Sequence, residues 1–148
     1  MYDDEKVIYV DSSKTMTKAH EHDVAYDLVY TGKTFMLNPL ERALCETNLQ
    51  KIAVPVGYAA LVAPRSGLAI KHGVTVLNAP GVIDPGYRDE VKVILVNLSN
   101  TPYEVKTGDR IAQIFAVKLA DKFVEAPQEH SVFDPIDNRH GGFGSSGK

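Results

Sequence analysis

The feature of this sequence that most restricts its fold is the regular alternation of short apolar runs with turn-forming residues. The runs are rich in β-branched and aromatic residues, as strands are. They span residues 6–10, 25–30, 34–37, 51–54, 58–63, 91–98, 103–105 and 111–119. Gly, Pro, Asn and Asp recur between them at intervals close to the roughly 8–12 residues of sandwiches and barrels. Because no helices alternate with these runs, the sequence predicts an all-β fold and disfavours a parallel α/β sheet.

One short helix is predicted to interrupt this pattern. Pro64 has the fixed φ that suits the start of a helix. Lys71 and His72 place cationic groups in a last turn, and Gly73 follows as the glycine that commonly ends a helix. We expect this helix to run from about Ser66 to His72.

The chain of 148 residues is long enough for one sizeable core. At this length roughly 68–70% of the unfolded surface can be buried without disulfides or a structural metal. After Phe133 the composition offers almost nothing to bury. We therefore predict a β domain over residues 1–133 and a flexible C-terminal arm over residues 134–148.

The cysteine content and the hydrophobicity pattern bear on where the protein works. Cys45 is the single cysteine, so it cannot form an internal disulfide, and we expect a small buried hydrophobe. The first residues lack the basic and apolar regions of a secretory signal. The longest uncharged stretch, residues 52–64, is interrupted by Pro55 and Gly57 and is shorter than the roughly 18 residues of a spanning helix. We expect a cytoplasmic protein without a membrane segment.

The charge balance limits the kinds of partner. The formal net charge is −3, and no block of Lys or Arg occurs along the chain. This argues against stable binding of nucleic acid but not against a small anionic ligand. Any phosphate site must therefore be built from a few local residues.

Two short patterns have an ordinary structural interpretation. Residues 31–34 end like a phosphate-binding P-loop, but Asp27 stands where that motif needs a glycine and a strand pattern follows it. A hairpin turn is the better interpretation. His20 and His22 lie on one side of an extended segment without a cysteine or third histidine nearby to complete a transition-metal site. We interpret that segment as a solvated loop.

Residues 64–67 are the first candidate for phosphate binding. A helix N-terminus presents unpaired backbone N–H groups and a partial positive charge. Arg65 adds a planar set of donors, Ser66 adds a hydroxyl, and Gly67 lets a ligand approach the backbone closely. The same residues are equally compatible with an ordinary helix cap, so both interpretations stay open.

Residues 78–87 are the second candidate. Asp84 precedes a Pro-Gly pair, which is typical of a type II turn, and a purely turn-forming aspartate is one interpretation. The alternative rests on its neighbours, since Asn78 and Tyr87 lie on the same predicted hairpin. Asp84 could orient and deprotonate a water, Tyr87 could pack against a sugar, and Asn78 could read a base edge.

The remaining candidates lie near the C-terminus. Arg110 and Gln113 begin a predicted strand and either face a ligand or tie neighbouring strands together. The tail over residues 139–147 combines glycine amides, two hydroxyls, a guanidinium and one aromatic ring. Such groups suit phosphate oxygens and stacking on a base.

Taken together, these segments resemble the trimeric dUTP pyrophosphatase (dUTPase) family. Five short motifs follow the family's order, at residues 24–28, 64–69, 78–90, 108–113 and 139–147. Any one motif is a weak signal, but five in order at family-like spacing are a strong one. The resemblance covers nearly everything from Val24 to Lys148.

The resemblance implies a jelly-roll-like β fold and a homotrimer with active sites at the subunit interfaces. It also implies Mg²⁺-dependent hydrolysis of dUTP to dUMP and pyrophosphate, which limits uracil incorporation into DNA and supplies dUMP for dTMP synthesis. The arm would close over the active site of a neighbouring subunit. About 15 residues at about 3.3 Å each could reach about 50 Å, farther than a small domain is wide.

The family's site residues transfer to matching positions. Asp84 would be the general base that activates water for in-line attack on the α-phosphate. Asp27 would face Mg²⁺ through bound water, in keeping with that ion's preference for oxygen ligands, waters and substrate phosphates. The other residues would bind nucleotide: Asn78, Gly81 and Val82 the uracil edge, Tyr87 the deoxyribose, Arg65, Ser66, Gly67 and Gln113 the phosphates, Arg139 the γ-phosphate, Phe143 the uracil face, and Gly144, Ser145 and Ser146 the phosphates.

The sequence also departs from the family pattern. Ala25 and Asp89 stand where the family usually has glycine, and Asp89 adds a carboxylate beside the sugar-binding segment. The fifth motif is about one residue shorter than expected before Phe143, so Asn138 and Arg139 are both candidates for the place of its arginine.

Two other functions remain as alternatives. A dCTP deaminase, or its bifunctional form, shares the fold but is typically longer and differs in the segment after Pro64. A non-catalytic, nucleotide-sensing regulatory protein would keep the pocket only for recognition. The intact set of Asp27, Arg65, Asp84 and Gln113 argues against an inactive site.

Overall fold

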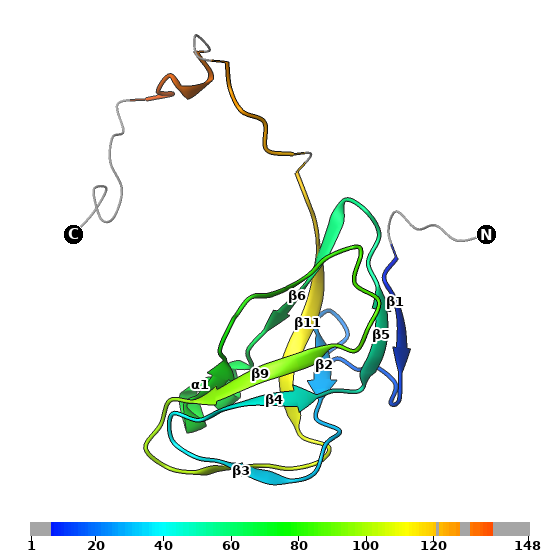
Figure 1. Cartoon of the computed structure of the whole chain (residues 1–148), viewed down its shortest axis with the longest axis vertical. Coiled ribbons are helices and arrows are strands. Elements are labelled where there is room, and N and C mark those ends of the chain that lie inside the picture. Colours follow the sequence, from blue (N-terminus) through cyan, green and yellow to red (C-terminus); the bar gives the residue numbers. More distant parts are fainter. Residues whose placement is uncertain (1–6, 121, 128–130, 138–148) are drawn as a thin grey trace.

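A four-stranded antiparallel sheet in the order β2-β11-β6-β8 carries Asp27, Gly81, Val82 and Gln113, and the other described candidate residues lie close to the ends of its strands in sequence (Figure 1). Its strands are β2 (Tyr26–Val29), β11 (Arg110–Lys118), β6 (Tyr58–Ala63) and β8 (Gly81–Ile83). The structure is a computed structural model that describes residues 7–120, 122–127 and 131–137. In the sheet, Gln113 lies opposite Asp27 on one side and Ala63 on the other.

A three-stranded sheet in the order β4-β9-β7 forms the other main layer. Its strands are β4 (Arg42–Glu46), β9 (Lys92–Asn97) and β7 (Val74–Val76). Two strand pairs complete the body: β1 (Tyr9–Ser12) with β5 (Leu49–Ala53), and β3 (Phe35–Leu37) with β10 (Tyr103–Val105). Buried side chains from both main sheets meet in one apolar cluster, including Leu28, Ile114, Val93 and Leu95. The predicted all-β fold is confirmed.

The short helix α1 (Ser66–His72) has the predicted bounds. Gly73 ends it in the left-handed conformation, with φ 65°, and its backbone N–H donates to the carbonyl of Ala69 at 3.0 Å. Arg65 occupies the position before the helix, and its side chain makes no capping hydrogen bond. The helix therefore starts without the side-chain cap that was the ordinary interpretation of residues 64–67.

Three predictions about local structure are wrong. Residues 31–34 do not close a hairpin, because β2 pairs with β11 whereas β3 pairs with β10. Residues 78–87 are not one hairpin either, since β8 pairs with β6 while β7 and β9 pair with each other. The turn after Asp84 does close, with the Tyr87 N–H donating to the Asp84 carbonyl at 3.1 Å. Gly86 does not have the positive φ of a type II turn, however.

Beyond β11 the chain leaves the body of the molecule (Figure 1). The described part of this segment includes one short 3₁₀ turn, η1 (Ser131–Phe133). Phe123 and Ile136 are fully exposed there, so this segment buries little apolar surface against its own chain.

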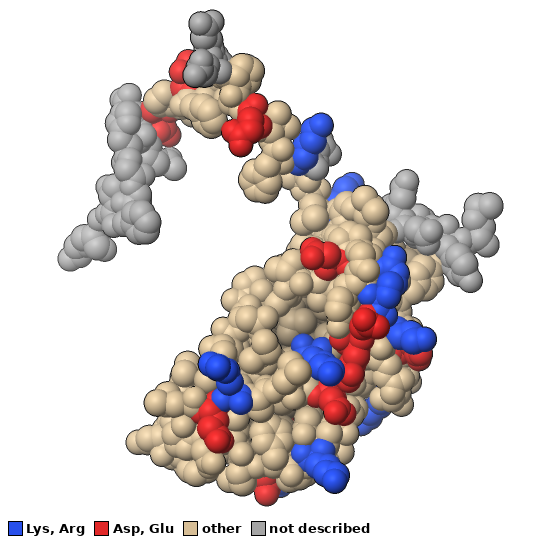
Figure 2. All heavy atoms as spheres, in the orientation of Figure 1, with Lys and Arg blue, Asp and Glu red and all other residues tan. Residues whose placement is uncertain are grey.

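The surface charges are mixed. On the face shown in Figure 2, Lys and Arg side chains are interspersed with Asp and Glu, and no continuous basic area forms. Within the described residues, no helix is long and apolar enough to cross a membrane.

Candidate functional site

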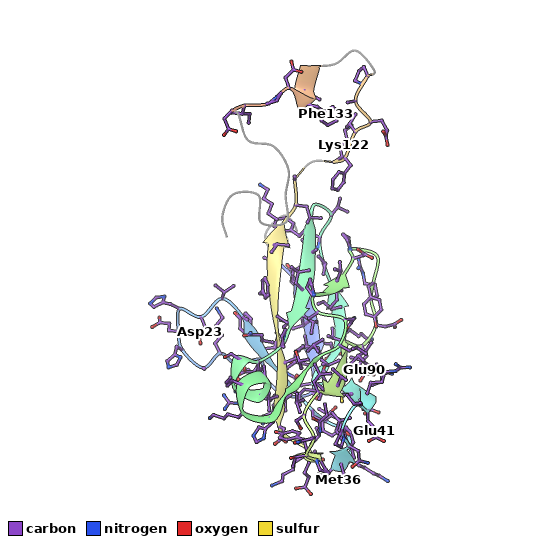
Figure 3. The ribbon with its side chains drawn as sticks, turned by 90° about the vertical axis from the view of Figure 1, so that its left-hand side faces the viewer. Asp23, Met36, Glu41, Glu90, Lys122 and Phe133 are labelled. Carbon is purple, nitrogen blue, oxygen red and sulfur yellow. The ribbon has the colours of Figure 1, made fainter. Side chains whose placement is uncertain are left out.

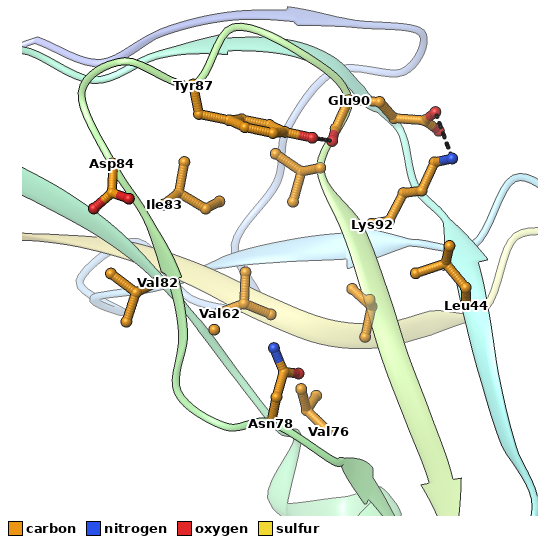
Figure 4. Close-up of a pocket in the computed structure, with 13 residues that line it drawn as sticks. Leu44, Val62, Val76, Asn78, Val82, Ile83, Asp84, Tyr87, Glu90 and Lys92 are labelled. Atoms are coloured by element: carbon orange, nitrogen blue, oxygen red, sulfur yellow. Dashed lines mark hydrogen bonds and ion pairs between the residues drawn. The ribbon is translucent and has the colours of Figure 1, made fainter.

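One cavity gathers the residues predicted to bind a base and a sugar and to activate water. Asn78, Gly81, Val82, Asp84 and Tyr87 all line it (Figure 4), and its volume is about 340 Å³. The rest of the wall is apolar except for Glu90 and Lys92, and its apolar residues are Leu44, Val62, Val76, Ile83, Val91 and Val93. A hollow of this size with a few polar groups at its edge is typical of a small-molecule site.

The loop after β8 fixes the ring of Tyr87 beside this cavity. The Tyr87 hydroxyl donates a hydrogen bond to the backbone carbonyl of Glu90 (Figure 4). The Tyr87 N–H donates to the carbonyl of Asp84. Both ends of the residue are therefore tied to its own loop. Asp84 itself is exposed to solvent, so its carboxylate can reach a water molecule.

Gly81 has a steric reason to be glycine. A Cβ atom at this position would lie 3.3 Å from the Cβ of Val62 and 3.7 Å from the side-chain nitrogen of Asn78. Glycine therefore lets β8 pack against Val62 of β6 without displacing it, and the side-chain amide of Asn78 lies near the same position. The cavity edge offers a side-chain amide next to main-chain N–H and C=O groups, the combination that reads the edge of a nucleobase.

A second cavity gathers the residues predicted to bind phosphate and metal. Asp27, Arg65, Ser66, Gly67 and Gln113 line it, and its volume is about 530 Å³. A Cβ atom at Gly67 would meet no other atom within 4 Å, so packing within the chain does not require glycine there. The space beside Gly67 is open to a ligand.

Two hydrogen bonds hold the wall of this second cavity together. The side-chain amide of Gln113 donates to the backbone carbonyl of Pro64 at 2.9 Å, and the Arg65 guanidinium donates to the carbonyl of Arg110 at 2.9 Å. Both join the segment before α1 to β11. Gln113 thus ties neighbouring elements together and also lines the cavity, so the two interpretations of this residue hold together.

Arg110 also lines this cavity, although no role in binding was assigned to it from the sequence. Its guanidinium nitrogen lies 3.8 Å from a carboxylate oxygen of Asp27, and both side chains line the cavity. Arg110 belongs to the fourth motif, which was the available signal. The sequence left open whether Arg110 faces a ligand, and it did not predict the contact with Asp27, which depends on the pairing of β11 with β2.

The residues present suit a magnesium ion better than a transition metal. No group of three His, Cys, Asp or Glu side chains that could hold a metal occurs among the residues that the structure describes. Asp27 offers one carboxylate toward the second cavity. Mg²⁺ commonly takes one or two carboxylates and completes its shell with waters and substrate phosphates, so Asp27 fits an ion that arrives with a polyphosphate.

The two cavities lie on different parts of the molecule and share no lining residue. Ile83 pairs with Ala60 near the start of β6, whereas Arg65 follows the end of that strand. The length of β6 therefore separates Asp84 from Arg65, roughly 20 Å at about 3.3 Å per residue. Figure 3 shows Asp23 and Glu90, which line the second and the first cavity, on opposite sides of the body.

A family model described as dUTPase matches residues 11–147. The chain belongs to the dUTPase family. Curated relatives in this family are named deoxyuridine 5'-triphosphate nucleotidohydrolase. The one from Wolbachia pipientis subsp. Culex pipiens is 54% identical over 76% of this chain and 72% of its own length. The one from Finegoldia magna is 45% identical over 80% of both chains.

Solved structures of dUTPases share the fold. A Staphylococcus bacteriophage 80alpha dUTPase with dUPNHPP superposes with a TM-score of 0.80 at 24% identity, covering 97% of this chain and 99% of that chain. A mutant dUTPase from phage phi11 of S. aureus, which coordinates a structural Mg(II) ion, gives a TM-score of 0.73 at 21% identity, over 84% and 98%. The jelly-roll-like fold expected of a dUTPase is confirmed.

Two other predictions for this dUTPase-family chain are confirmed, and one group of predicted residues lies outside the part that the structure describes. Cys45 is buried as expected, and burial raises the pKa of its thiol to about 11. His20 is exposed and its Nδ1 lies 3.4 Å from a carboxylate oxygen of Asp23, in line with a solvated loop. The last group of predicted site residues lies outside the described residues: Arg139, Phe143, Gly144, Ser145 and Ser146.

Proposed function

We propose that this chain hydrolyses dUTP to dUMP and pyrophosphate. The observation that carries the proposal is the placement of Asn78, Asp84 and Tyr87 around one cavity. This arrangement joins an amide that can read a base, a ring that can support a sugar, and a carboxylate that can take a proton. The curated relatives of the chain are named for the same reaction.

The first cavity would select the base and the sugar. The Asn78 amide and neighbouring main-chain groups of β8 can pair with the N–H and C=O groups of uracil. The Tyr87 ring would lie beneath the deoxyribose. Since its hydroxyl is tied to Glu90, the ring resists displacement, and a ribose 2′-hydroxyl would clash with it.

Asp84 would act as the general base. Its carboxylate accepts a proton from a water molecule while the water oxygen attacks the α-phosphorus. The bond from the α-phosphorus to the oxygen that bridges to the β-phosphate breaks in line with the attack. Pyrophosphate leaves with that oxygen, and dUMP keeps the new one.

The second cavity would hold the phosphate chain through Arg65, Ser66, Gly67 and Gln113. The guanidinium, the hydroxyl and the amide are donors that suit phosphate oxygens. A bound Mg²⁺ would supply neutralising charge and orientation for the phosphates. Asp27 would accept hydrogen bonds from the waters of that ion, which holds the phosphate chain against the cavity wall.

We further propose that each active site is shared between copies of a homotrimer. Within one chain, the separation of Asp84 from Arg65 by the length of β6 is longer than a triphosphate chain. Val10, Val24 and Tyr26 are exposed around an apolar hollow of the body, the kind of surface that a second copy covers. An assembly could therefore join the first cavity of one copy to the second cavity of another.

The C-terminal arm over residues 134–148 would close this shared site. Phe123 and Phe133, on the segment leading to the arm, and Ile136 within it are highly exposed, so they gain from apolar contacts with a neighbouring copy. In this proposal Arg139 reaches the γ-phosphate, Phe143 stacks on uracil, and Gly144, Ser145 and Ser146 wrap the phosphates. Closure would exclude water other than the nucleophile.

The reaction is tested with purified protein, Mg²⁺ and each of dUTP, dCTP, dTTP and UTP, with pyrophosphate and ammonia measured in parallel. Pyrophosphate from dUTP alone is expected. Ammonia from dCTP would instead identify a deaminase, and the absence of both products would identify a binding protein. Asp84→Asn is expected to abolish hydrolysis but keep binding of dUPNHPP, whereas Asp11→Asn, at an exposed position on β1, serves as the matched control.

The shared site has its own test. Light scattering after gel filtration gives the mass of the assembly, for which we expect three copies. Deleting the residues from Arg139 onward is expected to leave the number of copies in the assembly unchanged and to depress turnover of dUTP strongly. A truncated protein with full turnover would contradict the closing role of the arm, and a monomeric active protein would contradict the shared site.

A further inference from the structure

Arg110 lies beside a carboxylate in a cavity that is proposed to bind phosphate. The cavity must attract a polyphosphate, yet Asp27 places a carboxylate in its wall, and a carboxylate repels phosphate. The Asp27 side chain is only 14% exposed, so solvent screens its charge poorly. A cationic partner within the cavity removes the conflict, and the Arg110 guanidinium is that partner at 3.8 Å.

An irregularity in β11 aims Arg110 at Asp27. Gln113 pairs with Asp27 and Ala112 with Leu28, but Arg110, instead of Ile111, pairs with Val29. Side chains three positions apart on a regular strand point to opposite faces. The extra residue in β11 shifts the alternation, so Arg110 and Gln113 both line the second cavity.

The backbone of Arg110 is fixed while its guanidinium is free to change partner. Its carbonyl accepts the hydrogen bond from Arg65 at 2.9 Å, which anchors the start of β11. Its side chain is 50% exposed, and 3.8 Å is an ion-pair distance too long for a hydrogen bond. Among the described residues, the Arg110 guanidinium makes no hydrogen bond to another side chain. Its donors are therefore available to a ligand.

We propose that Arg110 neutralises Asp27 in the empty cavity and passes to the phosphate chain when the nucleotide arrives with Mg²⁺. The inference rests on the proposed function. With the ion present, the Asp27 carboxylate has a new cationic neighbour, and the guanidinium can donate to phosphate oxygens at no electrostatic cost to Asp27. Arg110 is then a positioning residue for Asp27 in one state and a binding residue in the other.

The test measures the Kd of dUPNHPP by calorimetry, with Mg²⁺ and with EDTA, for the wild type and for Arg110→Gln. In EDTA the variant removes the ion-pair partner of Asp27, so we expect the affinity of Arg110→Gln, relative to the wild type, to be about 10-fold lower in EDTA than in Mg²⁺. Adding Asp27→Asn to Arg110→Gln is expected to recover most of the extra loss in EDTA, because the repelling charge is gone. Arg42→Gln, at an exposed position on β4, is the matched control and should bind like the wild type.

A purely structural role for Arg110 predicts a different result. In that case Arg110→Gln would raise the Kd of dUPNHPP by the same factor with Mg²⁺ and with EDTA, and the added Asp27→Asn would restore no affinity. Either result would overturn the proposal. Arg110→Lys keeps the charge and should hold metal-free binding close to wild type, which assigns the loss in the Gln variant to the missing charge. Recovery by the added Asp27→Asn shows that the Gln variant is folded. If the wild type neither binds dUPNHPP nor releases pyrophosphate from dUTP, the proposed function itself is wrong. If the wild type does both and only the Arg110 variants depart from expectation, the role of Arg110 alone is wrong.

Discussion

The side-chain amide of Gln113 donates a hydrogen bond to the backbone carbonyl of Pro64 at 2.9 Å, across the junction between β11 and the segment that enters α1. Arg65, Ser66 and Gly67 follow Pro64 directly. The position of the proposed phosphate-binding segment therefore depends on a residue of the central sheet. A strand of the sheet thus holds the residue before α1 and, with it, the first turn of that helix.

Replacing Gln113 tests this dependence. Gln113→Glu removes the donor and sets a carboxylate against the Pro64 carbonyl and the phosphates. We expect the KM for dUTP to rise at least 10-fold and the free energy of unfolding to fall by about 1 kcal/mol, the value of one hydrogen bond. Gln50→Glu, at an exposed position on β5, is the control for an added charge. Unaltered KM in the Gln113 variant would show that the hydrogen bond does not position the segment.

Tyr87 is predicted to decide between deoxyribose and ribose. Tyr87→Ala removes the ring beneath the sugar, so we expect the ratio of kcat/KM for dUTP to that for UTP to fall about 10-fold or more. Tyr87→Phe keeps the ring and loses only the hydrogen bond to Glu90. It should therefore retain most of the discrimination. Equal ratios in the Ala variant and the wild type would remove Tyr87 from sugar selection.

Cys45 is predicted to be chemically inert in the folded protein. Burial raises the pKa of its thiol to about 11, so roughly 0.1% would be thiolate at pH 8. Iodoacetamide should label it only after unfolding. The raised pKa also makes stability depend on pH, because the buried thiol favours its neutral form. This contribution to the free energy of unfolding is complete below about pH 9 and is lost as the pH rises toward 11. Cys45→Ala should flatten the fall in stability over that window, and rapid labelling of the native protein would contradict the burial.

Leu40 is predicted to cost stability through its backbone. It has φ 65°, which side chains other than glycine and asparagine adopt at a cost, and its side chain is 77% exposed. Leu40→Asn loses little buried surface and should raise the free energy of unfolding by about 0.5–1 kcal/mol in urea titration. Leu98→Asn, exposed but without a positive φ, should give no gain. Equal effects at both positions would show that the gain comes from replacing an exposed leucine with a polar side chain and not from relief of backbone strain.

The elements with local signals were the ones predictable from the sequence. The bounds of α1 follow from Pro64, the basic last turn and Gly73, and β6 and β10 match their apolar runs. β4, β7 and β8 were missed. β8 has only three residues and lies between Pro80 and the Asp84 turn, so its extended form depends on pairing with β6, which no local pattern encodes.

The candidate site was predictable in its parts but not in its arrangement. The motif order assigned Asn78, Asp84 and Tyr87 to one function, and they share one cavity. The separation of Asp84 from Arg65 depends on the register between β8 and β6, and the orientation of Arg110 depends on the irregularity in β11. Registers join residues distant in sequence, so one sequence without its structure could not supply them.

The division of Asp84 and Arg65 between opposite ends of β6 has a genetic consequence. Two inactive variants, Asp84→Asn and Arg65→Ala, would carry their defects in different halves of the proposed shared site. When equal amounts are unfolded together and reassembled, about one quarter of the sites would combine an intact half from each parent. The mixed assemblies would then be active although each parent variant is inactive. In a cell, an allele defective at one position could be complemented by an allele defective at the other.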